Sequence, residues 1–134
     1  MKNVLVCVTG QRQCERLIRY GKELTEGDEG YLMVVHIAGY PLSELADGEL
    51  AENLEYLYRR AVEYETNLTI IRSENVIATM VSLINRFDIK RIVMGETREE
   101  KESDGTTAAF RELSYSDVQI IVVPEEEEPS DETL

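Results

Sequence analysis

Glycine and hydroxyl residues follow the apolar segment 89–94, and their types and spacing suit a phosphate group. Gly95 closes that segment, and Gly105-Thr106-Thr107 opens the stretch expected to form the last helix. Glycine lets the backbone approach a phosphate closely, and the free N–H groups at a helix start attract anions. The two threonine hydroxyls would add donors. The same residues are also ordinary strand-end and helix-start residues, so both interpretations stay open.

A second set of candidates follows the first apolar segment. Thr9 and Gly10 end it, Arg12 comes two residues later, and Arg98 lies beyond Gly95. An arginine guanidinium binds phosphate through paired N–H donors. Together with a glycine that follows the second apolar segment, these residues form one candidate ligand site: Thr9, Gly10, Arg12, Gly39, Gly95, Arg98, Gly105, Thr106 and Thr107.

Residues that could perform catalysis are few. His36 is the single histidine, so no His–His or Cys–His pair can be built around it, and we expect it to be a strand-end residue. The spacing of Cys7 and Cys14 matches neither a redox pair nor a zinc site, which predicts two reduced, packed thiols. The sequence contains no G-x-S-x-G segment and no P-loop lysine. We therefore expect no catalytic residue, no metal site and no enzymatic activity.

Apolar runs and helical stripes alternate along the chain and would position these residues. Continuous runs rich in β-branched residues predict strands over 4–8, 31–37, 68–72, 89–94 and 118–123. Apolar residues at helical spacing predict helices over 14–24, 50–62, 76–87 and 106–113. Ser73 is expected to cap the third helix, and Asn67 to close the second. Residues 43–48 are expected to be an extra turn or a separate short piece, and the charged segment 96–104 a loop.

This alternation predicts an α/β fold with three layers, a doubly wound parallel sheet of five strands in the order 3-2-1-4-5. The ligand crevice of such a sheet lies where the strand order reverses, at the carboxyl ends of the first and fourth strands. The loops 9–13, 38–40 and 95–107 would then face one another. We expect one domain over 1–124, followed by a disordered acidic tail over 125–134.

The charge of the chain excludes several kinds of partner. Its 134 residues carry a formal net charge of −13, or −7 without the six carboxylates of the tail. Binding to nucleic acid depends on clustered Lys and Arg, and no such cluster is present, so we expect neither nucleic acid nor a membrane surface as partner. The N-terminus has no signal segment, and no apolar run approaches the roughly 20 residues that span a bilayer. We expect a cytoplasmic protein.

Several segments resemble the universal stress protein family. They are the opening VLVCVTG followed by ERLIRYGKEL, the middle segment NVIATMVSLINRFDIKRIVMG and the close GTTAAFRELSYSDVQIIVVP. The opening is most similar to the stress-protein-like domain of KdpD-type potassium-sensing histidine kinases. The resemblance covers nearly all of the chain up to Pro124 and implies an adenine nucleotide alpha hydrolase-like fold.

The resemblance also implies a nucleotide site, although this sequence departs from the family's motif at several positions. Nucleotide-binding members have a Gly-x2-Gly-x9-Gly-Ser/Thr motif and an aspartate after the first strand. Gly95 matches the first glycine and Gly105-Thr106 the last pair, but Arg98 stands at the middle glycine and Thr9 at the aspartate. The loop is three residues short, and its residues 96–104 include five acids against two bases, which repel a triphosphate.

The leading interpretation is therefore a universal stress protein-like regulatory or sensing module. It would act by dimerisation and by binding a regulatory protein partner, with a small ligand in the crevice. The alternative is a protein that binds an adenine nucleotide (ATP or AMP) or a cyclic dinucleotide with a remodelled phosphate loop. The segment Val118–Val123 is apolar on both faces yet falls at an edge of the predicted sheet, which favours a homodimer through this strand. Universal stress proteins often dimerise through the same strand.

Overall fold

The structure is a computed structural model that describes residues 3–27, 30–38, 48–95 and 118–124. The helices and strands in this part of the chain follow one another in the order β1 (Asn3–Cys7), η1 (Arg12–Cys14), α1 (Glu15–Glu26), β2 (Leu32–Ala38), α2 (Gly48–Glu63), β3 (Leu68–Arg72), α3 (Val76–Phe87), β4 (Ile89–Gly95) and β5 (Gln119–Val123). η1 is a single 3₁₀ turn that leads directly into α1.

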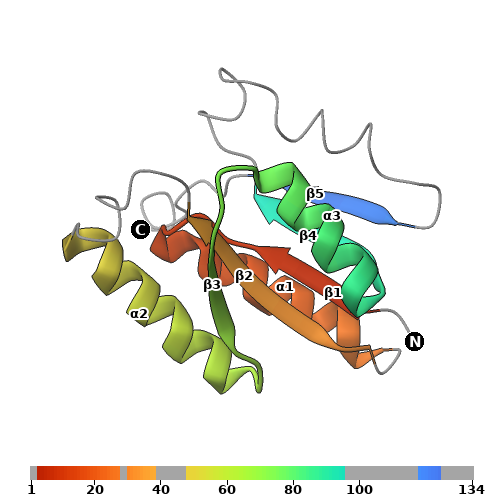
Figure 1. The fold of residues 1–134 in the computed structure, drawn as a ribbon. Coiled ribbons are helices and arrows are strands. Elements are labelled where there is room, and N and C mark those ends of the chain that lie inside the picture. The colour runs from red at the N-terminus through yellow and green to blue at the C-terminus, as the bar shows by residue number, and fades with distance from the viewer. Residues whose placement is uncertain (1–2, 28–29, 39–47, 96–117, 125–134) are drawn as a thin grey trace.

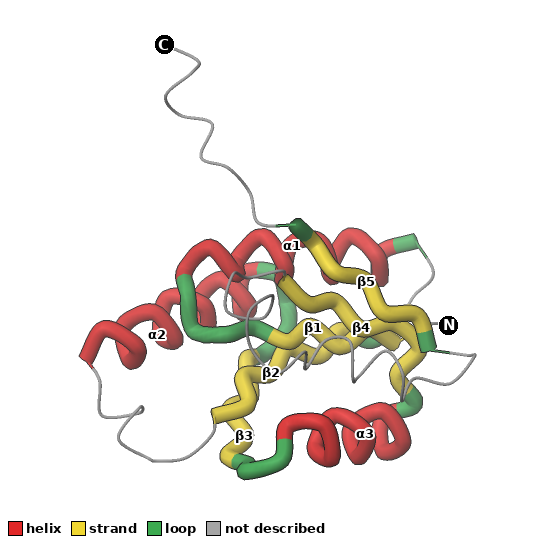
Figure 2. The backbone as a smooth tube through the Cα atoms, turned by 90° about the horizontal axis from the view of Figure 1, so that it is seen from above, coloured by secondary structure: helices red, strands yellow, loops and turns green. Residues whose placement is uncertain are grey.

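The five strands form one parallel sheet with the order β3-β2-β1-β4-β5, which confirms the predicted fold class and strand order (Figure 1). Helices α1 and α2 cover one face of the sheet and α3 covers the other, so the described part has three layers (Figure 2). β1 lies at the centre, between β2 and β4, and the direction of strand order reverses there.

The sheet divides the core into two apolar groups. Val4 and Val6 of β1 face α1 and α2, whereas Leu5 between them faces α3, and all three are fully buried. Both faces of the central strands are therefore covered, which explains why their sequences are continuously apolar rather than alternating. The same arrangement brings the carboxyl ends of β1 and β4 to one edge of the sheet.

Two predicted helix ends differ from the structure. The N-cap of α3 is Asn75, whose side chain accepts from the N–H of Ala78 at 3.0 Å, and not Ser73. The Ser73 hydroxyl instead accepts from the N–H of Asn75 at 3.0 Å and supports the turn before the cap. Helix α2 ends at Glu63 rather than at Asn67, because Glu65 has a left-handed φ of 65° and turns the chain out of the helix.

Several predictions fall on residues outside the described part. These are the loop 96–104, the helix 106–113, the segment 43–47 and the acidic tail 125–134. Gly48, the last residue of the predicted extra turn, is the first residue of α2.

Candidate functional site

A pocket of about 220 Å³ opens at the carboxyl ends of β1, β2 and β4, where the strand order reverses. We call it the crevice pocket. It is lined by residues at the ends of three strands and at the start of α3: Cys7, Val8, Thr9, His36, Ile37, Val76, Met80, Met94 and Gly95. A ligand site is expected at this place in an open α/β sheet.

The strand register explains why distant parts of the sequence meet here. In the parallel pair β1–β4, Cys7 lies opposite Met94, and Thr9 and Gly95 therefore follow at the same edge. Helix α3 crosses this edge and contributes Val76 from its first turn. The lining residues include no Asp, Glu, Lys or Arg, so the surface of the pocket is apolar and rich in sulfur.

Thr9 and Gly95 are the predicted site residues that line the crevice pocket. Gly10 follows directly, with a φ of +131°. This backbone angle favours glycine, and a Cβ atom there would also lie 2.5 Å from Cδ1 of Leu50, whose side chain would have to shift. The carboxyl ends of β1 and β4 therefore lie side by side.

Arg12 is held against α2 and does not line the pocket. Its Nε donates to Oδ1 of Asn53 at 2.9 Å, and its guanidinium lies 5.1 Å from the centre of the Tyr56 ring. These contacts attach η1 to α2. The other predicted residues, Gly39, Arg98, Gly105, Thr106 and Thr107, lie outside the described residues.

Arg16 is a cation near the crevice that the sequence did not indicate. It is only 8% exposed, and its Nη2 would lie 3.5 Å from a Cβ atom at Gly95. Nη1 donates to the carbonyl of Gln13 at 3.0 Å and Nη2 to that of Pro124 at 3.2 Å. Its Nε has no hydrogen-bond partner within the described part of the chain. Arg16 therefore joins the start of α1 to the end of β5.

His36 is buried near the end of β2, in agreement with its predicted place. Its Nδ1 lies 3.0 Å from the carbonyl oxygen of Val8. A carbonyl only accepts, so Nδ1 carries the proton in this contact and the imidazole ties β2 to the end of β1. Of the lining residues, the sequence did not single out the sulfur-bearing ones, because Cys7, Met80 and Met94 are indistinguishable from core residues until the register is known.

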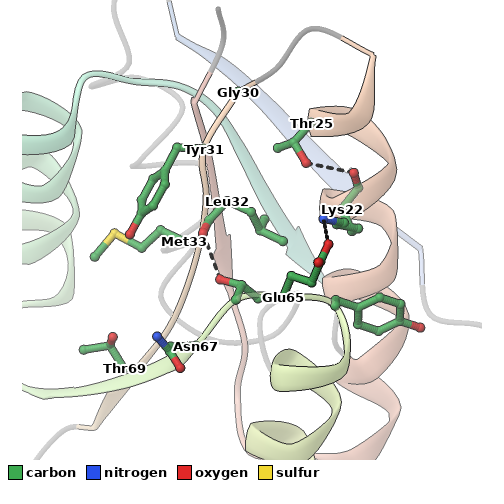
Figure 3. Close-up of a pocket in the computed structure, with 11 residues that line it drawn as sticks. Lys22, Thr25, Gly30, Tyr31, Leu32, Met33, Glu65, Asn67 and Thr69 are labelled. Atoms are coloured by element: carbon green, nitrogen blue, oxygen red, sulfur yellow. Dashed lines mark hydrogen bonds and ion pairs between the residues drawn. The ribbon is translucent and has the colours of Figure 1, made fainter.

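A second pocket, of about 320 Å³, lies at the opposite end of β2 and β3 (Figure 3). Lys22 forms an ion pair of 3.3 Å with Glu65, the Thr25 hydroxyl donates to the carbonyl of Lys22, and the Thr66 hydroxyl donates to that of Leu32. A ligand in an open parallel sheet is expected at the carboxyl ends of the strands, where their order reverses, so the crevice pocket is the better candidate.

The described residues show neither a metal cluster nor a membrane-spanning helix. No group of three or more His, Cys, Asp or Glu side chains in that part of the chain is placed to hold a metal ion. No described helix is both long enough and apolar enough to cross a lipid bilayer. Neither Cys7 nor Cys14 forms a disulfide.

No protein-family model matches the sequence, and no curated protein matches it either. Solved structures do match the fold. Universal stress protein UspA from Lactobacillus plantarum is similar with a TM-score of 0.68 and 18% identity, over 91% of this chain and 97% of that one.

Two of the similar structures contain a nucleotide. A universal stress protein in complex with cAMP has a TM-score of 0.68 and 13% identity, over 93% of this chain and 98% of that one. The universal stress protein from Archaeoglobus fulgidus in complex with dAMP has a TM-score of 0.61 and 14% identity, over 92% and 98%. At these identities the likeness is one of fold, and this chain has the fold of the universal stress proteins.

Proposed function

We propose that the chain is a regulatory module of the universal stress type that binds an adenine nucleotide with its ring in the crevice pocket. One observation carries this proposal: an apolar pocket lies where the strand order reverses. Structures of the same fold in complex with cAMP and with dAMP support it. The module would act in the cytoplasm by binding and not by turnover.

The lining chemistry suits a planar ring. The sulfur atoms of Cys7, Met80 and Met94 offer polarizable contacts, which are favourable against aromatic rings. The hydroxyl of Thr9 and the backbone at Gly95 supply polar groups at the rim. Because no lining residue is charged, the pocket discriminates by shape and stacking rather than by ion pairing.

The negative charge of the chain predicts the order of affinities among the nucleotide ligands. The chain has a net charge of −13, and each added phosphate brings further repulsion. We therefore expect AMP and cyclic nucleotides to bind more tightly than ATP. Cyclic dinucleotides, which carry two rings, are a second ligand class to be compared in the same titration.

Isothermal titration of AMP, cAMP, a cyclic dinucleotide and ATP with Mg²⁺ tests the proposal. Val76→Phe fills the pocket from the first turn of α3. It should weaken the binding of AMP at least about tenfold, or 1.4 kcal/mol. Val81→Phe adds the same side chain to the same helix outside the pocket and should leave affinity within about twofold. If none of the four ligands binds at millimolar concentration, nucleotide binding is refuted.

Partner binding completes the proposed function. The module would form a homodimer through β5 and present its acidic surface to a regulatory protein. Native mass spectrometry of freshly purified protein measures the copy number and any retained nucleotide together. A monomer at concentrations where a dimer should persist would contradict the dimer, whereas a retained adenine nucleotide would support the binding part.

A further inference from the structure

Three sulfur atoms from separate parts of the sequence line the crevice pocket. Cys7 on β1 and Met94 on β4 are opposite one another in the parallel register. Both side chains belong to the apolar group that faces α3, and Met80 comes down onto them from that helix. All three residues line the same cavity of about 220 Å³.

Three of the side-chain donors in this cavity are soft: one thiol and two thioethers. The Thr9 hydroxyl and the His36 imidazole also line it, and no lining residue contributes a carboxylate. Hard cations such as Mg²⁺ and Ca²⁺ require oxygen ligands, whereas thiolate and thioether sulfur selects copper(I).

We propose that Cys7, Met80 and Met94 form a site for one soft monovalent cation, copper(I) or silver(I). The Cys7 thiol loses its proton to solvent as the metal–sulfur bond forms, and the two thioethers donate lone pairs without losing a proton. The oxidation state of the metal does not change. The site goes beyond nucleotide binding and does not depend on it.

Burial and flexibility both suit such a site. Met80 is 1% exposed and Met94 6% exposed, so their thioethers meet the cavity rather than bulk water. A methionine side chain rotates about three bonds and can bring its sulfur toward a cation in a cavity larger than the ion itself. Cys7 is half-buried, which leaves the metal a route into the cavity.

Anaerobic competition with a chromophoric copper(I) chelator measures binding to the full chain. The wild type should take one copper(I) per chain, and silver(I), added as the nitrate, should displace it. Cys7→Ser should abolish binding, because no thiolate remains at the site. Met80→Leu and Met94→Leu should each weaken binding at least about tenfold, while these near-isosteric changes keep the fold intact.

The chain offers one matched control for the thioether ligands and one for the thiol ligand. Met33 packs on the same face of the sheet but lies at the other end of β2, and Cys14 is buried on the opposite face. Met33→Leu and Cys14→Ser should bind copper(I) as the wild type does, with circular dichroism confirming that each variant is folded.

The proposal is overturned if both pocket methionine variants bind like the wild type, if Cys14→Ser removes the metal, or if the wild type binds none. Nucleotide titrations of the same preparations report on the proposed function separately.

Discussion

Tyr64, just after the end of α2, contacts a carboxylate of α1. Its hydroxyl donates to Oε2 of Glu15 at 2.8 Å, and Nη2 of Arg60 lies 3.4 Å from the same oxygen. Burial, followed by the hydrogen bond to the Glu15 carboxylate, raises the pKa of Tyr64 above its ordinary value of 10.0. The neutral phenol is therefore the form that holds the two helices together.

Tyr64→Phe should lower the free energy of unfolding by about 1–2 kcal/mol at pH 7, the usual size for a hydrogen bond to a charged acceptor. The folded-state pKa is the higher one, so this contribution is complete below about pH 10 and is lost as pH rises through the folded-state pKa. Urea unfolding at pH 7 and above pH 10 measures the difference from the wild type, which should shrink at the higher pH.

Tyr58→Phe is the matched control, since Tyr58 lies on α2, about two turns before Tyr64, and is 48% exposed. It should leave stability unchanged at both pH values. Equal losses in the two variants would show that the Glu15 contact contributes nothing.

At the scale of elements, the end of α2 is closed by backbone hydrogen bonds around a left-handed residue. The N–H of Thr66 donates to the carbonyl of Ala61 at 2.9 Å, and that of Glu65 to the carbonyl of Val62 at 2.9 Å. This is the Schellman arrangement, in which the left-handed position is usually glycine. Here it is Glu65, with a φ of 65° and an exposed ion pair to Lys22.

Glu65→Gly should leave the protein at least as stable as the wild type. Relief of the left-handed strain is worth about 1–2 kcal/mol, which exceeds the exposed ion pair at about 0.2–1 kcal/mol and offsets the added flexibility of the unfolded chain. Glu63→Gly, two residues earlier at the last position of α2, also removes an exposed ion pair but relieves no left-handed strain, and the added flexibility of the unfolded chain should cost about 0.4–1 kcal/mol. The prediction is wrong if Glu63→Gly has a higher melting temperature than Glu65→Gly.

The start of α3 depends on its cap. Asn75→Ala removes the acceptor for the N–H of Ala78 and should destabilise the protein by about 1 kcal/mol. Glu74→Ala changes the exposed neighbour and should have no measurable effect in the same urea titration. A loss of similar size in both variants would mean that the cap adds nothing specific.

These two helix ends show which local features the sequence could predict. Asn75 immediately precedes the first apolar residue of the α3 stripe, so the cap could have been assigned to it from position alone. The end of α2 could not, because Glu65 occupies a position where glycine is the recognisable stop. The strands were predicted to within a residue or so. Burial on both faces gives the central strands a continuous apolar pattern, and β-branched residues mark the two edge strands.

At the scale of the whole molecule, the sequence predicted the place of the site better than its chemistry. Strict alternation of strands and helices determines which loops meet, and so Thr9 and Gly95 were identified as neighbours. The direction of a long side chain depends on contacts that no local pattern encodes. Arg12 therefore lies against α2, while Arg16, one turn later, is the arginine beside Gly95.

The sheet has two edge strands, and a lysine on each can test through which of them two copies associate. β5 forms one edge and β3 the other, and Ile70 of β3 is 47% exposed. A lysine on an edge strand opposes pairing with another strand. If the homodimer forms through β5, Val122→Lys should produce a folded monomer, whereas Ile70→Lys should remain dimeric in sedimentation velocity experiments.

The charge of the chain adds a second, independent test of that dimer. Each copy carries −13, so association brings like charges together, and salt should relieve the repulsion. The screening length falls from about 10 Å at 0.1 M salt to about 3 Å at 1 M. The dimer dissociation constant should therefore decrease over this range, by roughly tenfold, or about 1.4 kcal/mol. A dissociation constant that rises with salt would mean that ion pairs hold the copies together, and pairing through the apolar β5 edge would then be the wrong description.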